Sequence, residues 1–225
     1  MDTAGAGQAN INRPALVDFL ERLRFPVSYL DFETFFTAVP KFDGLRPYQQ
    51  VPFQFSFHKQ DAPGAPVTHA GFLADGTIDP RPEFLAGLRE CLASSGSVVV
   101  YNQSFEKSVL NALAKAFPEN TEWIEDVVDR LIDLLVPFRR FDYHHPLQRG
   151  SASIKAVIPV LTGRSYDDLV IQEGGTASRE YLRVQFGDVT VDERQRVRRQ
   201  LEEYCGRDTE GMVWIVDALR KIVSL

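Results

Sequence analysis

Two carboxylates interrupt a largely apolar segment of this chain, Val27-Ser28-Tyr29-Leu30-Asp31-Phe32-Glu33-Thr34. The segment favours a β-strand, and because strand side chains alternate between faces, Asp31 and Glu33 point to the same side. Two acids on one face repel each other, and a divalent cation is the usual reason that a fold keeps them together. The segment therefore predicts a strand that carries part of a metal site, provided that further carboxylates meet it.

Two later segments supply carboxylates that can reach this strand. Val98-Val99-Val100-Tyr101 is short and β-branched, as buried strands are, and a polar turn leads from it into a helix over residues 105–117. Glu106 therefore follows the C-terminal end of a strand, which is the edge where open α/β sheets place their sites. On the last helix, Tyr204 and Asp208 are four residues apart and share one face. Four carboxylates from three distant segments can thus meet at one point.

The early part of the chain predicts three strands in an antiparallel meander. After the strand at 27–32, Phe53, Phe55 and Phe57 alternate with polar residues and indicate a half-buried strand. Alternating aromatics of this kind can stack on bases, but they more often belong to a core, and we favour the core. Residues 67–73 are a weaker strand candidate.

The rest of the chain reads as helices around these strands, in one domain of α/β type. Residues 1–10 are small and polar, so we expect a disordered tail followed by a single domain over 11–225. The apolar run at 131–136 is open between helix and strand. Residues 167–187 are poorly patterned, with a break at Gly174-Gly175. The expected helices cover residues 14–23, a stretch between Pro82 and Gly96, residues 105–117, a stretch from about 122, residues 153–161, and residues from the capping box of Thr190 and Glu193 to about 223.

Composition limits the class of protein. The 225 residues carry a net charge of −6, which argues against a strongly basic nucleic-acid coat. It does not exclude a nucleic-acid enzyme, because bound metal ions neutralise phosphate charge locally. Only Cys91 and Cys205 are present, so we expect neither a disulfide framework nor a cysteine zinc site. With no apolar run of membrane-spanning length and no signal pattern, a cytoplasmic protein is the expectation.

The spacing of the acids resembles that of the DEDD superfamily of 3′–5′ exonucleases. Asp31 and Glu33 match its first motif, Asn102 with Phe105-Glu106 its second, and Tyr204 with Asp208 the third motif of its tyrosine branch. The resemblance implies a ribonuclease-H-like fold, a mixed five-stranded sheet with three antiparallel strands followed by parallel ones, flanked by helices. It also implies two Mg²⁺ or Mn²⁺ ions held by the four carboxylates Asp31, Glu33, Glu106 and Asp208, with Tyr204 orienting the attacking water.

The span from about Ile11 to Leu225 also looks like a bacterial domain family of this superfamily that has no settled substrate. Members of that family often form one part of a longer chain. The expected activity is metal-dependent hydrolysis of phosphodiester bonds at DNA or RNA ends. The segments that carry the likeness are Tyr29–Thr34, Val51-Pro52-Phe53-Gln54, Tyr101-Asn102, Phe105-Glu106-Lys107, Asp133-Leu134, Gly150–Lys155 and Tyr204–Thr209.

Several other residues are candidates for contact with the substrate. Ser151, Ser153 and Lys155 can bind phosphate at a helix start, although simple helix capping explains them equally well. His144 and His145 lack partner cysteines for zinc, so we favour a loop role near the substrate. Asp133 is interpreted as a structural or supporting acid, and the arginines at 194–199 as a solvated helix face. The expected substrate-binding residues are Thr34, Asn102, His144, Ser151 and Lys155.

Glu106 stands where the superfamily usually has Asp. Glu is one methylene longer and still binds Mg²⁺ or Ca²⁺ in many sites. Together with the acidic net charge, it motivates a second hypothesis: a domain that keeps the fold, binds nucleic acid or a partner protein, and has lost efficient chemistry. A third hypothesis is a phosphatase or nuclease of small nucleotides. The sequence leaves DNA and RNA open.

Overall fold

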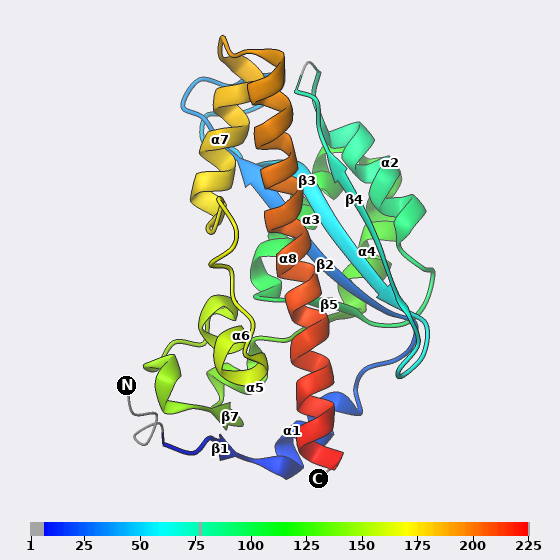
Figure 1. Cartoon of the computed structure of the whole chain (residues 1–225). Coiled ribbons are helices and arrows are strands. Elements are labelled where there is room, and N and C mark those ends of the chain that lie inside the picture. The colour runs from blue at the N-terminus through cyan, green and yellow to red at the C-terminus, as the bar shows by residue number, and fades with distance from the viewer. Residues whose placement is uncertain (1–6, 77, 225) are drawn as a thin grey trace.

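The computed structural model describes residues 7–76 and 78–224, and its centre is a single mixed sheet of five strands (Figure 1). The strands lie in the order β4-β3-β2-β5-β6. Neighbours β2, β3 and β4 are antiparallel, whereas β5 and β6 run parallel to β2. The prediction of an α/β fold with a mixed five-stranded sheet is confirmed. The strands are β2 (Val27–Phe35), β3 (Val51–Gln60), β4 (Val67–Leu73), β5 (Val98–Val100) and β6 (Leu131–Asp133).

Helices cover both faces of this sheet. The long helix α8 crosses one face with α7 beside its upper part, while α2, α3 and α4 lie on the other face (Figure 1). A two-stranded sheet of β1 (Asn10–Ile11) and β7 (Tyr143–His144) lies apart from the main one. The helices are α1 (Arg13–Leu20), α2 (Arg81–Cys91), α3 (Gln103–Ala116), α4 (Thr121–Asp129), α5 (Val136–Arg139), α6 (Ile154–Thr162), α7 (Gly174–Phe186) and α8 (Val191–Ser224), with short 3₁₀ turns η1 (Pro118–Asn120) and η2 (Pro146–Gln148).

Strand β3 is buried on both faces, so the prediction of a half-buried strand was wrong. Its aromatic residues do belong to the core, as expected. A register shift between Glu33 and Thr34 inserts one extra residue of β3, and Phe53 then packs against Tyr181 of α7 with ring centres 3.9 Å apart. Phe55 packs on the opposite face, against Phe84 of α2. The bulge thus divides a row of aromatics between two cores.

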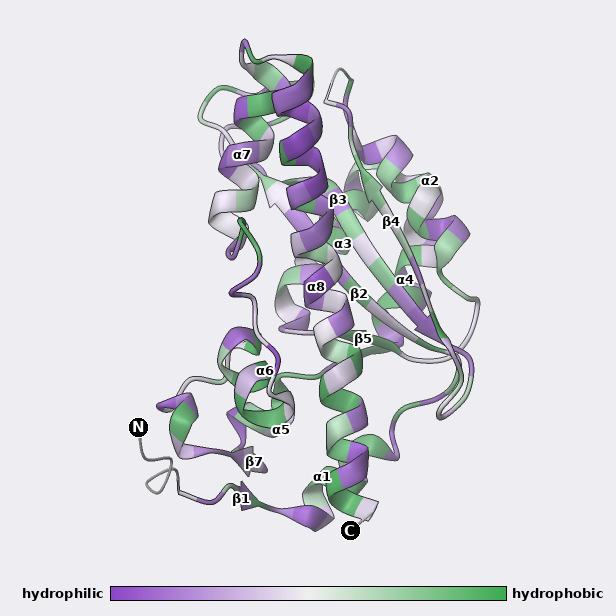
Figure 2. Ribbon diagram, in the orientation of Figure 1, coloured by the Kyte–Doolittle hydropathy of each residue, from purple (hydrophilic) through white to green (hydrophobic). Residues whose placement is uncertain are grey.

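The clearest predicted helix is confirmed as α8. The Thr190 hydroxyl accepts a hydrogen bond from the Glu193 backbone N–H at 3.2 Å, which is one half of the expected capping box. Figure 2 shows that the first part of α8 is largely hydrophilic and that its later part carries most of the apolar residues. Helix α8 packs on β2, β3 and α6, and its buried residues from Val197 to Leu219 fix its position.

The structure settles one segment that the sequence left open and corrects another. The open run at 131–136 divides into strand β6 and the start of α5. Gly174-Gly175, predicted as a break, begins the thirteen-residue helix α7, because Ala177, Tyr181 and Val184 bury one face of it against the core. Residues 1–6 of the predicted disordered tail lie outside the described residues, whereas Asn10 pairs with His144 in the small sheet.

Candidate metal centre

Three of the predicted carboxylates meet where α8 crosses β2. Oxygen atoms of Asp31, Glu33 and Asp208 all lie within 4.8 Å of one another. Asp31 and Glu33 point to the same face of β2, as the alternation of strand side chains predicts. Glu33 and Asp208 are each only 7% exposed. Residues separated by more than 170 positions in the chain therefore form one compact acidic cluster.

The fourth carboxylate, Glu106, approaches from a different side. Strand β5 runs parallel to β2, so the chain leaves both strands at the same edge of the sheet. Asn102 adopts a left-handed backbone conformation (φ 79°) at the turn, its N–H donates to Asp133 Oδ1 at 3.0 Å, and α3 begins. Glu106 in the first turn of α3 is 1% exposed and its Oε2 has no hydrogen-bond partner in the described part of the chain. It lines the same pocket but is not within the 4.8 Å group.

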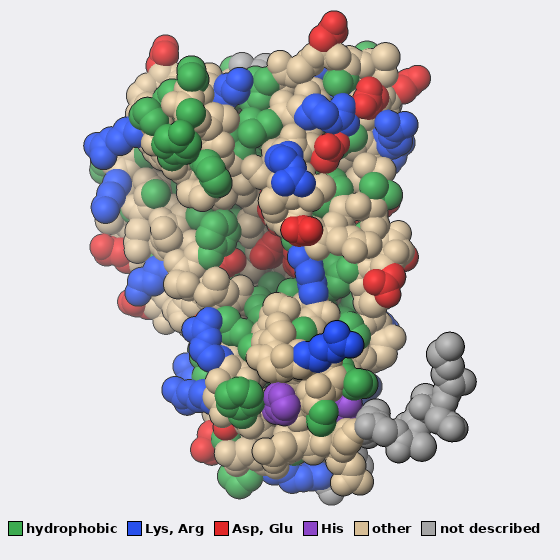
Figure 3. Space-filling view, turned by 90° about the vertical axis from the view of Figure 1, so that its left-hand side faces the viewer, with side chains coloured by type: hydrophobic (Ala, Val, Ile, Leu, Met, Phe, Trp, Pro, Cys, Tyr) green, Lys and Arg blue, Asp and Glu red, His purple; other side chains and the backbone are tan. Residues whose placement is uncertain are grey.

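A cavity of about 330 Å³ gives access to these acids. Figure 3 shows acidic side chains at the bottom of a hollow between the upper and lower parts of the molecule. At its rim the Phe36 side chain is 51% exposed. The cavity combines carboxylates at its base with polar, aromatic and glycine residues around them, which are Phe32, Thr34, Phe36, Gln50, Tyr101, Asn102, Phe105, Gly174, Gly175, Ser178 and Tyr204.

Burial raises the pKa of these carboxyl groups, and repulsion between neighbouring carboxylates adds to that effect. Burial raises the pKa of Asp31 well above its ordinary value, and the neighbouring Asp208 and Glu33 raise it further. Burial also raises the pKa of Glu33 and that of Glu106 to about 8 each. The pKa of Asp208 is raised by burial, while a hydrogen bond from Tyr166 acts in the opposite direction. A cluster of this kind gains most from a bound cation, which would compensate the buried negative charge.

Two tyrosines and a lysine complete the cluster. Lys155 Nζ on α6 donates to the Tyr204 hydroxyl at 3.2 Å, and the Tyr166 hydroxyl donates to Asp208 Oδ1 at 2.6 Å. Burial is the main cause that raises the pKa of Tyr204 and that of Tyr166, so both hydroxyls keep their protons. Each can therefore act as a hydrogen-bond donor at neutral pH, and neither is a base.

The predicted substrate-binding residues divide into two groups. Thr34 and Asn102 line the cavity and Lys155 contacts Tyr204, so the structure brings these three to the site. The Thr34 hydroxyl bonds the Gln50 side chain. Ser151 is exposed and bonds Ser153 Oγ at 3.2 Å, while His144 pairs with Asn10 in the small sheet. Neither Ser151 nor His144 lines the cavity.

Sequence reasoning missed three residues of the site. Tyr166 lies in the irregular segment between α6 and α7, where no periodicity indicated its contact with Asp208. Gly174 begins α7 so close to the acids that an added Cβ would lie 3.3 Å from Glu33 Oε2. Cys205 Sγ lies 3.6 Å from Asp31 Oδ2, and its position between Tyr204 and Asp208 on one helix was the available signal.

The fold and the cluster define an α/β domain with a buried acidic cluster, a candidate metal centre, towards the C-terminal ends of β2 and β5. Residues 28–153 match the family DUF2779, a domain of unknown function, and the chain belongs to that family. Asp31, Glu33 and Glu106 lie within the matched segment and Asp208 beyond it.

Two proteins of mycoplasmas are similar over most of this chain. One is "Uncharacterized protein MG366 homolog" of Mycoplasma pneumoniae, 27% identical over 87% of this chain, and the other is "Uncharacterized protein MG366" of Mycoplasma genitalium, 24% identical over 87% of it. The chain spans 32% of the length of each of these relatives. No solved structure matches. Within residues 7–76 and 78–224, no helix combines the length and the apolar character needed to cross a membrane.

Proposed function

We propose that this domain is a metal-dependent 3′–5′ exonuclease of the tyrosine branch of the DEDD superfamily, with a ribonuclease-H-like fold, acting on DNA or RNA. The observation that carries the proposal is the convergence of Asp31, Glu33 and Asp208 within 4.8 Å, with Glu106 in the same cavity. The sheet order, with three antiparallel strands followed by two parallel ones, supports the proposed fold.

The chemistry of the donor set fits hard divalent cations. All four candidate ligands are carboxylates, and oxygen ligands are those that Mg²⁺ and Mn²⁺ prefer. The buried Oε2 of Glu106, which has no hydrogen-bond partner among residues 7–76 and 78–224, is a further sign that the cavity is built around a positive charge. Asp31, Glu33, Glu106 and Asp208 would hold two ions. When bound, such ions supply an activated water and stabilise the leaving oxygen of a phosphodiester.

The chain's own residues would orient the reactants. The protonated Tyr204 hydroxyl lies beside Gly174 and Glu33, where it can donate a hydrogen bond to an attacking water. Lys155 Nζ positions that hydroxyl by donating a hydrogen bond to it at 3.2 Å. Tyr166 fixes the rotamer of Asp208 through its 2.6 Å hydrogen bond. These contacts preorganise the site before a substrate arrives, which is where much of enzymatic rate enhancement originates.

The shape of the cavity favours the end of a strand as the substrate. Its volume of about 330 Å³ is at the small end for ligand pockets, so it admits a terminal nucleotide and not a continuous duplex. Phe36 at the rim exposes an aromatic face on which a base can stack without regard to its identity. Such stacking is compatible with both DNA and RNA.

The proposal is tested by following the shortening of a labelled oligonucleotide with Mg²⁺ or Mn²⁺. Asp31→Ala should abolish metal-dependent degradation, whereas the exposed Asp188→Ala is the matched control and should leave it unchanged. A 3′ label and a 5′ label in parallel reactions report the direction of cleavage. Equal activity of Asp31→Ala and the unmodified protein would remove the proposal.

A second candidate function is binding of nucleic acid or a partner protein without efficient cleavage. The observation that favours it is that Glu106 stands outside the group of acids that lie within 4.8 Å of one another. Fluorescence anisotropy would detect oligonucleotide binding, and the absence of cleavage across Mg²⁺ and Mn²⁺ would select this candidate. Glu106→Asp separates the two further, because it should create activity only if the longer side chain is what prevents it.

A further inference from the structure

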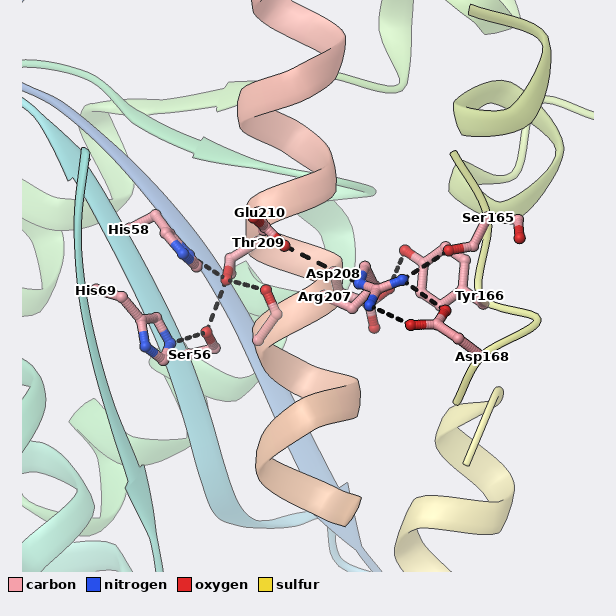
Figure 4. Close-up of polar contacts among 11 residues, drawn as sticks. Ser56, His58, His69, Ser165, Tyr166, Asp168, Arg207, Asp208, Thr209 and Glu210 are labelled. Carbon is pink, nitrogen blue, oxygen red and sulfur yellow. Dashed lines mark hydrogen bonds and ion pairs between the residues drawn. The ribbon is translucent and has the colours of Figure 1, made fainter. Parts of the chain in front are cut away.

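A second polar cluster lies on the opposite side of α8 from Tyr166 and Asp208. His58 of β3 and His69 of β4 are directly opposite one another in the antiparallel pair, and their ring centres are 4.4 Å apart. Figure 4 shows both rings facing Thr209 of α8 and Ser56, while Tyr166 and Asp168 lie beyond the helix. Since imidazole nitrogens bind zinc at about 2.0–2.1 Å, two rings at this separation are close enough to share one ion.

Each ring uses one nitrogen in a hydrogen bond with a hydroxyl group. His58 Nδ1 lies 2.7 Å from Thr209 Oγ1, which is also 2.7 Å from Ser56 Oγ and 3.1 Å from the Gly206 carbonyl oxygen. His69 Nε2 lies 3.0 Å from Ser56 Oγ. Each hydroxyl oxygen can accept from its histidine, and in that pair of tautomers His58 Nε2 and His69 Nδ1 carry the lone pairs that can bind a metal ion.

This arrangement is the one that metal-binding histidines adopt. A histidine ligand usually donates its other ring N–H to an oxygen of the protein, and that hydrogen bond sets the tautomer and the ring orientation. Here Thr209 and Ser56 provide such oxygens for both rings. Burial lowers the pKa of His58 to about 4 and that of His69 below its ordinary value, so both rings are neutral at physiological pH.

The charged residues around His58 and His69 favour a cation over an anion as the ligand. The two rings border an open cavity of about 720 Å³ whose other charged residues include Glu202, Glu203 and Glu210. The positive charge of Arg207 is already bound by Asp168 through two hydrogen bonds of 2.8 and 2.9 Å. An anionic ligand would meet three carboxylates here. A purely oxygen-binding ion such as Mg²⁺ would not use the imidazoles.

We propose that His58 and His69 bind a divalent transition-metal ion of the Zn²⁺ class, with water completing the shell. Glu210 lies on the same cavity, but among the described residues its carboxylate does not form a group with both rings within 4.8 Å, so the two imidazoles are the proposed protein ligands. This site is separate from the carboxylate cluster and does not depend on the proposed nuclease activity. Imidazole nitrogens favour ions such as Zn²⁺ and Cu²⁺, whereas carboxylates favour Mg²⁺ and Mn²⁺, so the two sites prefer different metals.

The test is a calorimetric titration of the full chain with Zn²⁺ in the presence of excess Mg²⁺. His69→Ala should weaken Zn²⁺ binding by about tenfold or more, because a ligand is lost from the edge strand β4. His58→Gln should do the same. The matched control is His144→Gln, which removes a histidine outside the pair and should bind as the unmodified chain does.

A spectroscopic readout identifies the ligands independently. Cu²⁺ added to the unmodified chain should give an electron paramagnetic resonance signal split by imidazole nitrogens, and His69→Ala should reduce that splitting. Absence of Zn²⁺ binding by the unmodified chain, or equal Zn²⁺ affinity of the unmodified chain and both histidine variants, would overturn the proposal. Circular dichroism of each variant shows that it is folded before its titration is interpreted.

Discussion

Glu33→Gln is predicted to stabilise the metal-free protein at alkaline pH, even though it removes a candidate metal ligand. Glu33 is 7% exposed, and burial, with the charge of Asp208 next, raises its pKa from 4.5 to about 8. A carboxyl group with a raised folded-state pKa contributes its full stability below pH 4.5 and loses it as the pH rises towards 8. Gln is neutral and of nearly the same shape, so the variant avoids that loss.

The size of the effect follows from the shift in pKa. The raised pKa of Glu33 lowers the free energy of unfolding by about 4 kcal/mol at pH 8 and by about 1 kcal/mol at pH 5, relative to a group whose pKa is the same in both states. These figures are upper limits for the gain, because the Gln amide must also find hydrogen bonds in the cavity. We expect Glu33→Gln to exceed the unmodified chain in free energy of unfolding by about 2–4 kcal/mol at pH 8, and by about 1 kcal/mol or less at pH 5.

Urea denaturation in EDTA at both pH values measures this difference, with the exposed Glu125→Gln as matched control. Comparing variant with unmodified chain at the same pH cancels the opposite contribution of His58, whose lowered pKa costs stability below pH 6.5. Mn²⁺ should then stabilise the unmodified chain more than the variant, because only the former keeps all four carboxylates. Lower stability of Glu33→Gln at pH 8, or an advantage independent of pH, would refute the reasoning.

Two further substitutions test how the site is positioned. Tyr166→Phe removes the 2.6 Å hydrogen bond to Asp208 and should weaken Mn²⁺ binding about tenfold by calorimetry without loss of fold, and unchanged affinity would contradict that role. Lys155→Met removes the cation that favours ionised Glu33, so the pKa of Glu33 should rise and the acidic limb of a pH–rate profile should move to higher pH. A profile that stays in place would show that Lys155 acts elsewhere.

The parts of the site that could be predicted depend on local periodicity. Strand alternation alone places Asp31 and Glu33 on one face, and helical periodicity alone places Tyr204 and Asp208 on one face. Both relations hold in the structure because the elements concerned are long and regular, nine residues in β2 and thirty-four in α8.

The parts that could not be predicted depend on tertiary contacts. Helix α7 begins with Gly174-Gly175, which disfavours a helix intrinsically, and it is stabilised by the burial of residues such as Tyr181. Strand β6 has three residues and exists through its pairing with β5. Tyr166 reaches Asp208 from an irregular segment, and no pattern in the sequence indicates the path of such a segment.

The acidic cluster can persist without a cation only because α8 is anchored elsewhere. Leu201, Met212, Ile215, Val216 and Leu219 on α8 are each 0% exposed. Burying five such side chains contributes on the order of 10 kcal/mol before the cost of ordering the chain. The raised pKa of Glu33 lowers the free energy of unfolding by about 4 kcal/mol at pH 8, so the apolar contacts hold Asp208 against β2 although the charges repel. The carboxylates therefore remain preorganised for an ion, and binding does not have to assemble them.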